Sequence, residues 1–129
     1  MFAKGSFDVK LNPLQVYNST AKSKLGRMSI DKEFSGDLEG ISKGEMLSSF
    51  GGVEGSAGYV AVEEVDCVLQ GHKGTFVLQH NAVMSHGAQE LNIIVVPDSG
   101  TGELKGLTGK MKIDIIEGKH FYEFEYDIV

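Results

Sequence analysis

The sequence has few of the residues that mark several common classes of protein. Among its 129 residues, Cys67 is the only cysteine, so no disulfide can form within the chain. It has only 2 prolines and no tryptophan but 17 glycines, a composition that favours many turns over a proline-rich linker. Because Cys67 alternates with Val65 in an apolar segment, we expect a buried, inert thiol and not a nucleophile.

Long apolar runs and long basic runs are also missing. The longest apolar stretches have the length of a strand, which argues against a membrane-spanning helix. The net charge is −6, and the small cluster Lys22, Lys24 and Arg27 is interpreted as a solvated loop, so we expect no nucleic-acid partner. Residues 1–5 lack the apolar block of a signal peptide. We therefore expect a cytoplasmic protein with no membrane partner.

The C-terminal stretch predicts a long β-hairpin. Its arms are residues 106–115 and 120–128, and the pair Glu117-Gly118 between them suits a two-residue turn that needs positive φ. That turn places Met111 opposite Phe124 on an apolar face. On the other face it pairs two lysines with two glutamates, Lys110 with Glu125 and Lys112 with Glu123. One register therefore satisfies both faces.

Alternating apolar and polar residues predict strands along the rest of the chain, and no segment shows a helical period. Residues 91–96 are apolar and rich in β-branched side chains, which indicates a strand that is buried on both faces or is central in the sheet. We expect Gly100-Thr101-Gly102 to open a strand, with a bulge at Gly106 that brings Leu104 and Leu107 to the same face. The count is about eight strands in one domain, residues 1–129. Because closure removes exposed strand edges, we favour an all-β, closed antiparallel barrel over the alternative of a β-sandwich.

The strand between residues 38 and 46 carries glycines on one face. Gly40 and Gly44 flank Ser42 there, so this face of the strand has few side chains. Such a face lets bulky neighbours or a ligand approach closely.

Several runs resemble a bacterial family of small barrels known only as a domain of unknown function. The runs are Arg27–Lys32, Phe34–Gly40, Gly44–Leu47, Phe76–His80 and Pro97–Leu104. That family is similar in fold to allene oxide cyclase and dirigent proteins, and residues 100–109 look like the Gly-Thr-Gly strand of those barrels. The resemblance implies an apolar ligand inside the barrel and self-association. The cyclase's catalytic residues have no match here, so its activity does not carry over.

The inward-facing positions are mostly apolar, and their polar exceptions are the candidate site. We take Glu63 and His80 as candidate catalytic residues, because a carboxylate can orient an imidazole and raise its basicity. A turn at Gly71-His72 would place them opposite each other, and a longer loop would make them diagonal neighbours. The candidate ligand-binding residues are Lys32, Ser42, Tyr59, Phe76 and Tyr122. The alternative is a structural pair near the rim, with Lys32 reaching out to solvent.

These residues favour a barrel that binds a small apolar or amphipathic molecule. The alternatives are a cofactor-independent isomerase or cyclase that acts in the cavity, and a non-catalytic structural or oligomerisation module. The four histidines lack the spacing of a metal site, so we expect neither a metal nor a cofactor. Apolar residues on the outward parity, Ile41, Leu47 and Ile116, predict a homo-oligomer, either a dimer or a trimer.

Overall fold

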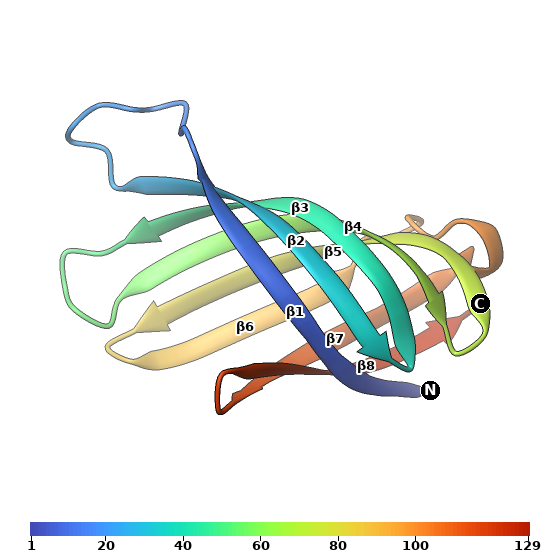
Figure 1. Ribbon diagram of the computed structural model, residues 1–129. Coiled ribbons are helices and arrows are strands. Elements are labelled where there is room, and N and C mark those ends of the chain that lie inside the picture. The colour runs from blue at the N-terminus through green and yellow to red at the C-terminus, as the bar shows by residue number, and fades with distance from the viewer.

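A computed structural model describes all 129 residues as eight antiparallel strands closed into a barrel in chain order (Figure 1). The strands are β1 (Phe2–Leu14), β2 (Leu25–Gly36), β3 (Leu38–Phe50), β4 (Ala57–Leu69), β5 (His72–Ser85), β6 (Ala88–Val95), β7 (Leu107–Ile116) and β8 (Lys119–Ile128). The one helical element is the 3-10 turn η1 (Gly102–Leu104), and no helix is long and apolar enough to cross a membrane. The expected barrel is confirmed, and the sandwich alternative is wrong.

Three hairpins are closed by the same two-residue turn. In Gln70–Gly71, His86–Gly87 and Glu117–Gly118, both residues have positive φ and the second is glycine. This is the geometry that matches the twist of antiparallel strands. The predicted register of β7 and β8 is confirmed, since Lys110 lies opposite Glu125 and Lys112 opposite Glu123.

Two local expectations were wrong. The turn between β4 and β5 is Gln70–Gly71 and not Gly71-His72, because glycine takes the second position of the turn as in the other two hairpins. Residues 102–104 form η1 in place of a strand with a bulge, and β7 begins only at Leu107. The helical turn lets both Leu104 and Leu107 be buried without a bulge.

The inward and outward faces follow the predicted alternation with one correction. Strand β6 is not buried on both faces, because Ile93 is 1% exposed while its neighbour Ile94 is 44% exposed on the outer wall. Every other residue of β6 therefore faces solvent, as in the rest of the barrel.

One end of the barrel is packed solid, and both termini lie at this end (Figure 1). Phe76 stacks on Phe124 with ring centroids 5.8 Å apart, and Phe124 stacks on Tyr126 at 5.3 Å. Leu104 of η1 is fully buried against this cluster and closes the end.

Cys67 belongs to the same cluster, where burial, and then the charge of Asp66, raises the pKa of its thiol to about 12. The expectation of a buried thiol is confirmed.

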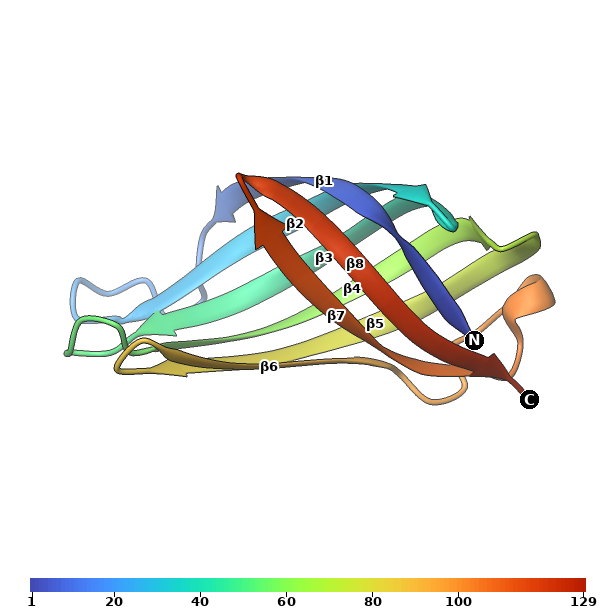
Figure 2. The ribbon, with the colours of Figure 1, turned by 90° about the horizontal axis from the view of Figure 1, so that it is seen from below.

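The barrel wall is incomplete between β6 and β7. These strands pair only at Ile93 with Met111 and at Ile94 with Lys110, whereas β3 and β4 pair along their whole length. Beyond Met111 the β7–β8 hairpin diverges from the β5–β6 hairpin, and Figure 2 shows the two turns well apart. The barrel is thus closed at the packed end and open along one side towards the other end.

Candidate functional site

A cavity of about 430 Å³ occupies the open half of the barrel. Its walls are mainly apolar side chains of β1, β2, β6 and β7. These are Phe7, Val9, Leu11, Ile30, Leu91, Ile113 and Ile115. Because Leu91 and Ile113 lie on the two strands that part, the cavity opens to the side where the β6–β7 ladder ends.

A second hollow of about 410 Å³ adjoins the first near the open end. The two share Leu11, Met46, Tyr59 and Gln89. Its remaining lining is mostly apolar and includes Met28 of β2. The two hollows together offer a long space with a polar floor at one end and apolar walls at the other.

The floor of the cavity is a polar cluster centred on the carboxylate of Glu63, which is completely buried. Lys32 Nζ donates to Glu63 Oε2 at 2.8 Å, and His80 Nε2 lies 2.6 Å from the same oxygen. Ser42 Oγ donates to Glu63 Oε1 at 2.9 Å. Three donors from β2, β3 and β5 therefore converge on one carboxylate carried by β4, which satisfies its buried charge.

Glu63 is held in its ionised form. Burial alone would raise the pKa of this carboxyl, but the hydrogen bond to His80 and the charge of Lys32 outweigh it and lower the pKa from 4.5 to about 2. Burial, and next the negative charge of Glu63, raise the pKa of the Tyr59 phenol. At neutral pH the cluster thus presents a carboxylate at its centre and a protonated Tyr59 hydroxyl on the cavity wall.

The structure divides the candidate residues from the sequence into three groups. Lys32, Tyr59 and His80 line the cavity. Glu63 and Ser42 lie directly behind them and reach the cavity only through Lys32 and His80. Glu63 and His80 are diagonal neighbours, because Glu63 pairs with Leu78 and His80 with Ala61, yet their side chains meet.

Phe76 and Tyr122 do not line the cavity. Phe76 is fully buried in the aromatic stack of the packed end. The Tyr122 hydroxyl accepts a hydrogen bond from the Leu38 amide at 2.9 Å and lies 2.9 Å from the Ser35 carbonyl oxygen, to which it donates. Both side chains face the barrel interior, as predicted, but they lie in the packed core and not beside the cavity, where they contribute to packing.

The sequence interpretation missed the cavity residues of the open end. His120 lines the cavity and packs against Phe7 in a tilted arrangement, with ring centroids 5.1 Å apart. Gln89 and Asp114 flank the side opening on β6 and β7. The parity of His120 with Tyr122 and Phe124 could have identified it, but nothing local to the sequence marks the point where β6 and β7 separate.

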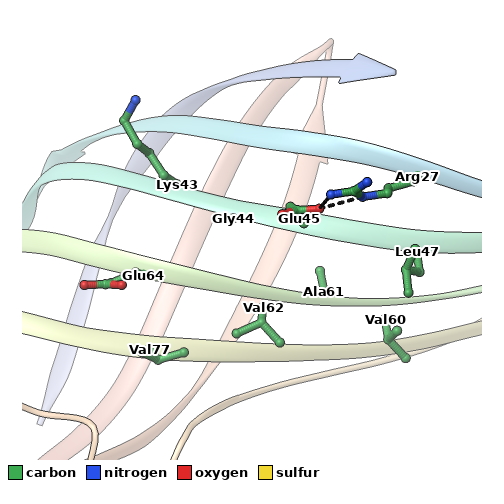
Figure 3. A pocket seen from close by; sticks show the side chains of 10 residues that line it. All are labelled: Arg27, Lys43, Gly44, Glu45, Leu47, Val60, Ala61, Val62, Glu64 and Val77. Carbon is green, nitrogen blue, oxygen red and sulfur yellow. Dashed lines mark hydrogen bonds and ion pairs between the residues drawn. The ribbon is translucent and has the colours of Figure 1, made fainter. Parts of the chain in front are cut away.

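The outer wall carries a separate hollow of about 450 Å³ over β3, β4 and β5 (Figure 3). Leu47, Val60 and Val62 line it, and an ion pair of Arg27 with Glu45 at 2.6 Å lies at its margin. Leu47, Val60 and Val62 are exposed on the outer wall, and no residue of the polar cluster lines this hollow. We treat it as a surface and not as part of the site.

The arrangement offers a base, an acid and an apolar space side by side. The imidazole of His80 is oriented by a carboxylate, and the ammonium of Lys32 is bound to the same oxygen. Such a set can bind a polar group and can move a proton. The chain brings no cluster of acidic or sulfur ligands to the cavity.

Comparison with known proteins assigns this architecture to a family without a known activity. The family model described as protein of unknown function (DUF3224) matches residues 3–126. A crystal structure of a DUF3224 protein of unknown function from Shewanella oneidensis MR-1 is 49% identical, with a TM-score of 0.94. The match covers 100% of this chain and 98% of the other. No curated protein matches the chain.

Proposed function

The chain belongs to the DUF3224 family, and we propose that it binds a small amphipathic molecule in the open half of its barrel. The single observation that supports this is the uneven filling of the interior. One half is packed with aromatic and aliphatic side chains, while the other half holds a cavity of about 430 Å³ with a polar floor. Protein interiors are normally close-packed, so a barrel that served only as a scaffold should have side chains filling both halves.

The chemistry of the lining selects the kind of ligand. Small-molecule sites are concave and mostly apolar, with a few polar groups that fix orientation. Here the polar groups gather at the floor, where Lys32 and His80 face the cavity, and the walls towards the adjoining hollow are apolar. The polar end of the ligand would lie against Lys32 and His80, with its apolar part directed towards Met28 and Met46.

The incomplete wall provides a route to the cavity. Because β6 and β7 do not pair beyond Met111, a ligand can reach the floor from the side without passing the packed end. Gln89 and Asp114 stand on either side of this route.

A pair of substitutions on neighbouring residues of β4 tests the proposal. Ala61 lines the cavity and is 3% exposed, while Val60 faces outwards and is 52% exposed. Ala61→Phe should fill the cavity and weaken binding of the amphipathic dye 8-anilinonaphthalene-1-sulfonate by tenfold or more, and Val60→Phe should leave it unchanged. Circular dichroism and urea unfolding check that both variants fold.

Native mass spectrometry of freshly purified protein gives an independent measurement. A co-purified small molecule that is lost from Ala61→Phe supports the proposal. Equal dye affinity in wild type and a folded Ala61→Phe variant contradicts it, because the dye would then bind elsewhere.

A further inference from the structure

We propose that the Lys32–Glu63–His80 cluster catalyses proton transfer at a carbon atom next to a carbonyl group, and hence that the ligand is an enolisable ketone or aldehyde. This inference rests on the proposed function, because the substrate must occupy the same cavity. It follows from the positions of the His80 imidazole, the Lys32 ammonium and the Glu63 carboxylate at the cavity floor.

The first element is a histidine whose free nitrogen faces the cavity. The short contact of His80 Nε2 with Glu63 Oε2, 2.6 Å, places the ring proton on Nε2, because an ionised carboxylate only accepts. In the neutral form of the ring, the other nitrogen, Nδ1, then carries the lone pair. Nδ1 itself makes no hydrogen bond, whereas every side-chain nitrogen that is buried from solvent has a partner. Nδ1 is therefore not buried, and because His80 lines the cavity, this nitrogen is exposed to it. A buried carboxylate that fixes the tautomer of a histidine is the arrangement that prepares a general base.

The second element is a cation next to that base. Lys32 Nζ binds the same carboxylate oxygen at 2.8 Å, so the ammonium and the imidazole are neighbours. The ammonium has three N–H groups, and its bond to Glu63 uses one of them. Because Lys32 also lines the cavity, another N–H group can donate to a ligand there. A fixed donor in an apolar surrounding stabilises negative charge that develops on a carbonyl oxygen.

The third element is the rigidity of Glu63 itself. Ser42 occupies Oε1 while Lys32 and His80 share Oε2, so the carboxylate cannot rotate without breaking a hydrogen bond. Glu63 does not touch the substrate and acts as a positioning residue. It also remains ionised and balances the charge on His80 when the ring accepts a proton.

The step balances without any further reactant. His80 Nδ1 removes a proton from the carbon next to the carbonyl, the electrons of the broken C–H bond form a C=C bond, and the carbonyl π electrons move to the oxygen. The resulting enolate oxygen accepts a hydrogen bond from Lys32. Nδ1–H then returns the proton. Return to the same carbon restores the substrate or gives its epimer, and return to the far end of a conjugated system gives an isomer with a shifted double bond; neither needs an oxidation or a reduction.

Exchange of carbon-bound protons in D2O tests this step with a defined probe, α-tetralone. Its two protons next to the carbonyl are followed by proton NMR, and its binding is measured separately by saturation-transfer NMR. We expect wild type to exchange them faster than buffer, and His80→Gln to lose about 100-fold of that rate, because positioned general bases contribute on the order of 100-fold or more. Gln can still bond Glu63, so the fold is kept. His72→Gln, at the exposed first residue of β5 and outside the cavity, is the matched control and should exchange like wild type.

The outcomes separate the two proposals. If α-tetralone binds but exchanges no faster than in buffer, or if folded His80→Gln exchanges like wild type, the catalytic inference is overturned and the binding function stands. If the anilinonaphthalene dye binds and α-tetralone does not, the inference also fails, because the cavity then rejects an enolisable ketone. If neither compound binds, the proposed function fails together with it.

Discussion

Removing the charge of Glu63 should destabilise the protein more than removing the charge of Lys32. Glu63 accepts three hydrogen bonds and is completely buried, so Glu63→Gln leaves the Lys32 ammonium buried without a counter-charge. Breaking a buried ion pair in this way costs about 3–5 kcal/mol. Lys32→Met leaves the carboxylate with two of its donors, His80 and Ser42, and should cost about 1–3 kcal/mol.

The double variant provides the decisive comparison. In Lys32→Met/Glu63→Gln the uncompensated charge is gone, and only hydrogen bonds are lost, so it should be more stable than Glu63→Gln alone. Urea unfolding followed by circular dichroism gives the free energies, with the slope of each transition checking that the unfolded states match. In a chain of this size about 1 kcal/mol corresponds to roughly 4 °C, so Glu63→Gln should lower Tm by roughly 12–20 °C.

Two results would refute the reasoning. If Glu63→Gln unfolds within about 1 kcal/mol of wild type, the Lys32 ammonium has moved into the cavity, and the cluster is not a tightly coupled buried network. If the double variant is no more stable than Glu63→Gln, the cost comes from the shape of the glutamine and not from the unpaired lysine.

Four further predictions follow from single features. Since the pKa of Glu63 falls from 4.5 to about 2 on folding, its contribution of about 3 kcal/mol is complete above pH 4.5 and is lost as pH falls through 2; Glu63→Gln should remove this part of the acid dependence in urea titrations. Cys67 should react with Ellman's reagent only after unfolding, and prompt reaction in buffer would contradict its burial. Gly44→Ala should destabilise severely, because its Cβ would come within 2.8 Å of Glu63 Cβ, whereas Gly52→Ala, with open space around it, should be neutral in the same thermal melts. If the outer wall mediates a homo-oligomer as proposed from its apolar residues, Leu47→Glu should reduce the mass measured by light scattering, and a wild type that is monomeric at high concentration refutes the oligomer.

The C-terminal hairpin could be predicted because several local signals agree on one register. The Glu117–Gly118 turn, the apolar face and the two Lys–Glu pairs all require the same alignment of β7 with β8. The turn at Gln70–Gly71 has the same chemistry, yet the sequence left a choice there between a turn at Gly71-His72 and a longer loop, because no charge pairing pointed to the register of β4 and β5. The first of these shifts the pairing by two residues and keeps the faces, so Glu63 and His80 still meet diagonally.

The position of a residue along the barrel axis could not be predicted. Alternation shows that Tyr59, Phe76 and Tyr122 all face inwards, and the structure confirms this. Whether an inward residue lies in the packed half or beside the cavity depends on how the strands are staggered and on where β6 leaves β7. Both are consequences of the whole sheet, so Tyr59 lines the cavity while Phe76 and Tyr122 do not.

The glycine-rich face of β3 packs directly against the backbone of β4 beside the buried charge of Glu63. Gly44 pairs with Glu63, and a side chain at Gly44 would meet the Glu63 backbone, with its Cβ 2.7 Å from Glu63 Cα. Ser42, two residues earlier, is small enough to turn its hydroxyl to Glu63 Oε1. The glycines on β3 thus let the β4 backbone come close, and the small Ser42 side chain supplies one of the three hydrogen bonds to the buried carboxylate. The two glycines are therefore explained by the close approach of the β4 backbone, which any residue at position 63 or 67 would require. The polar partners are explained by the carboxylate, because an apolar residue at position 63 would need none of the three.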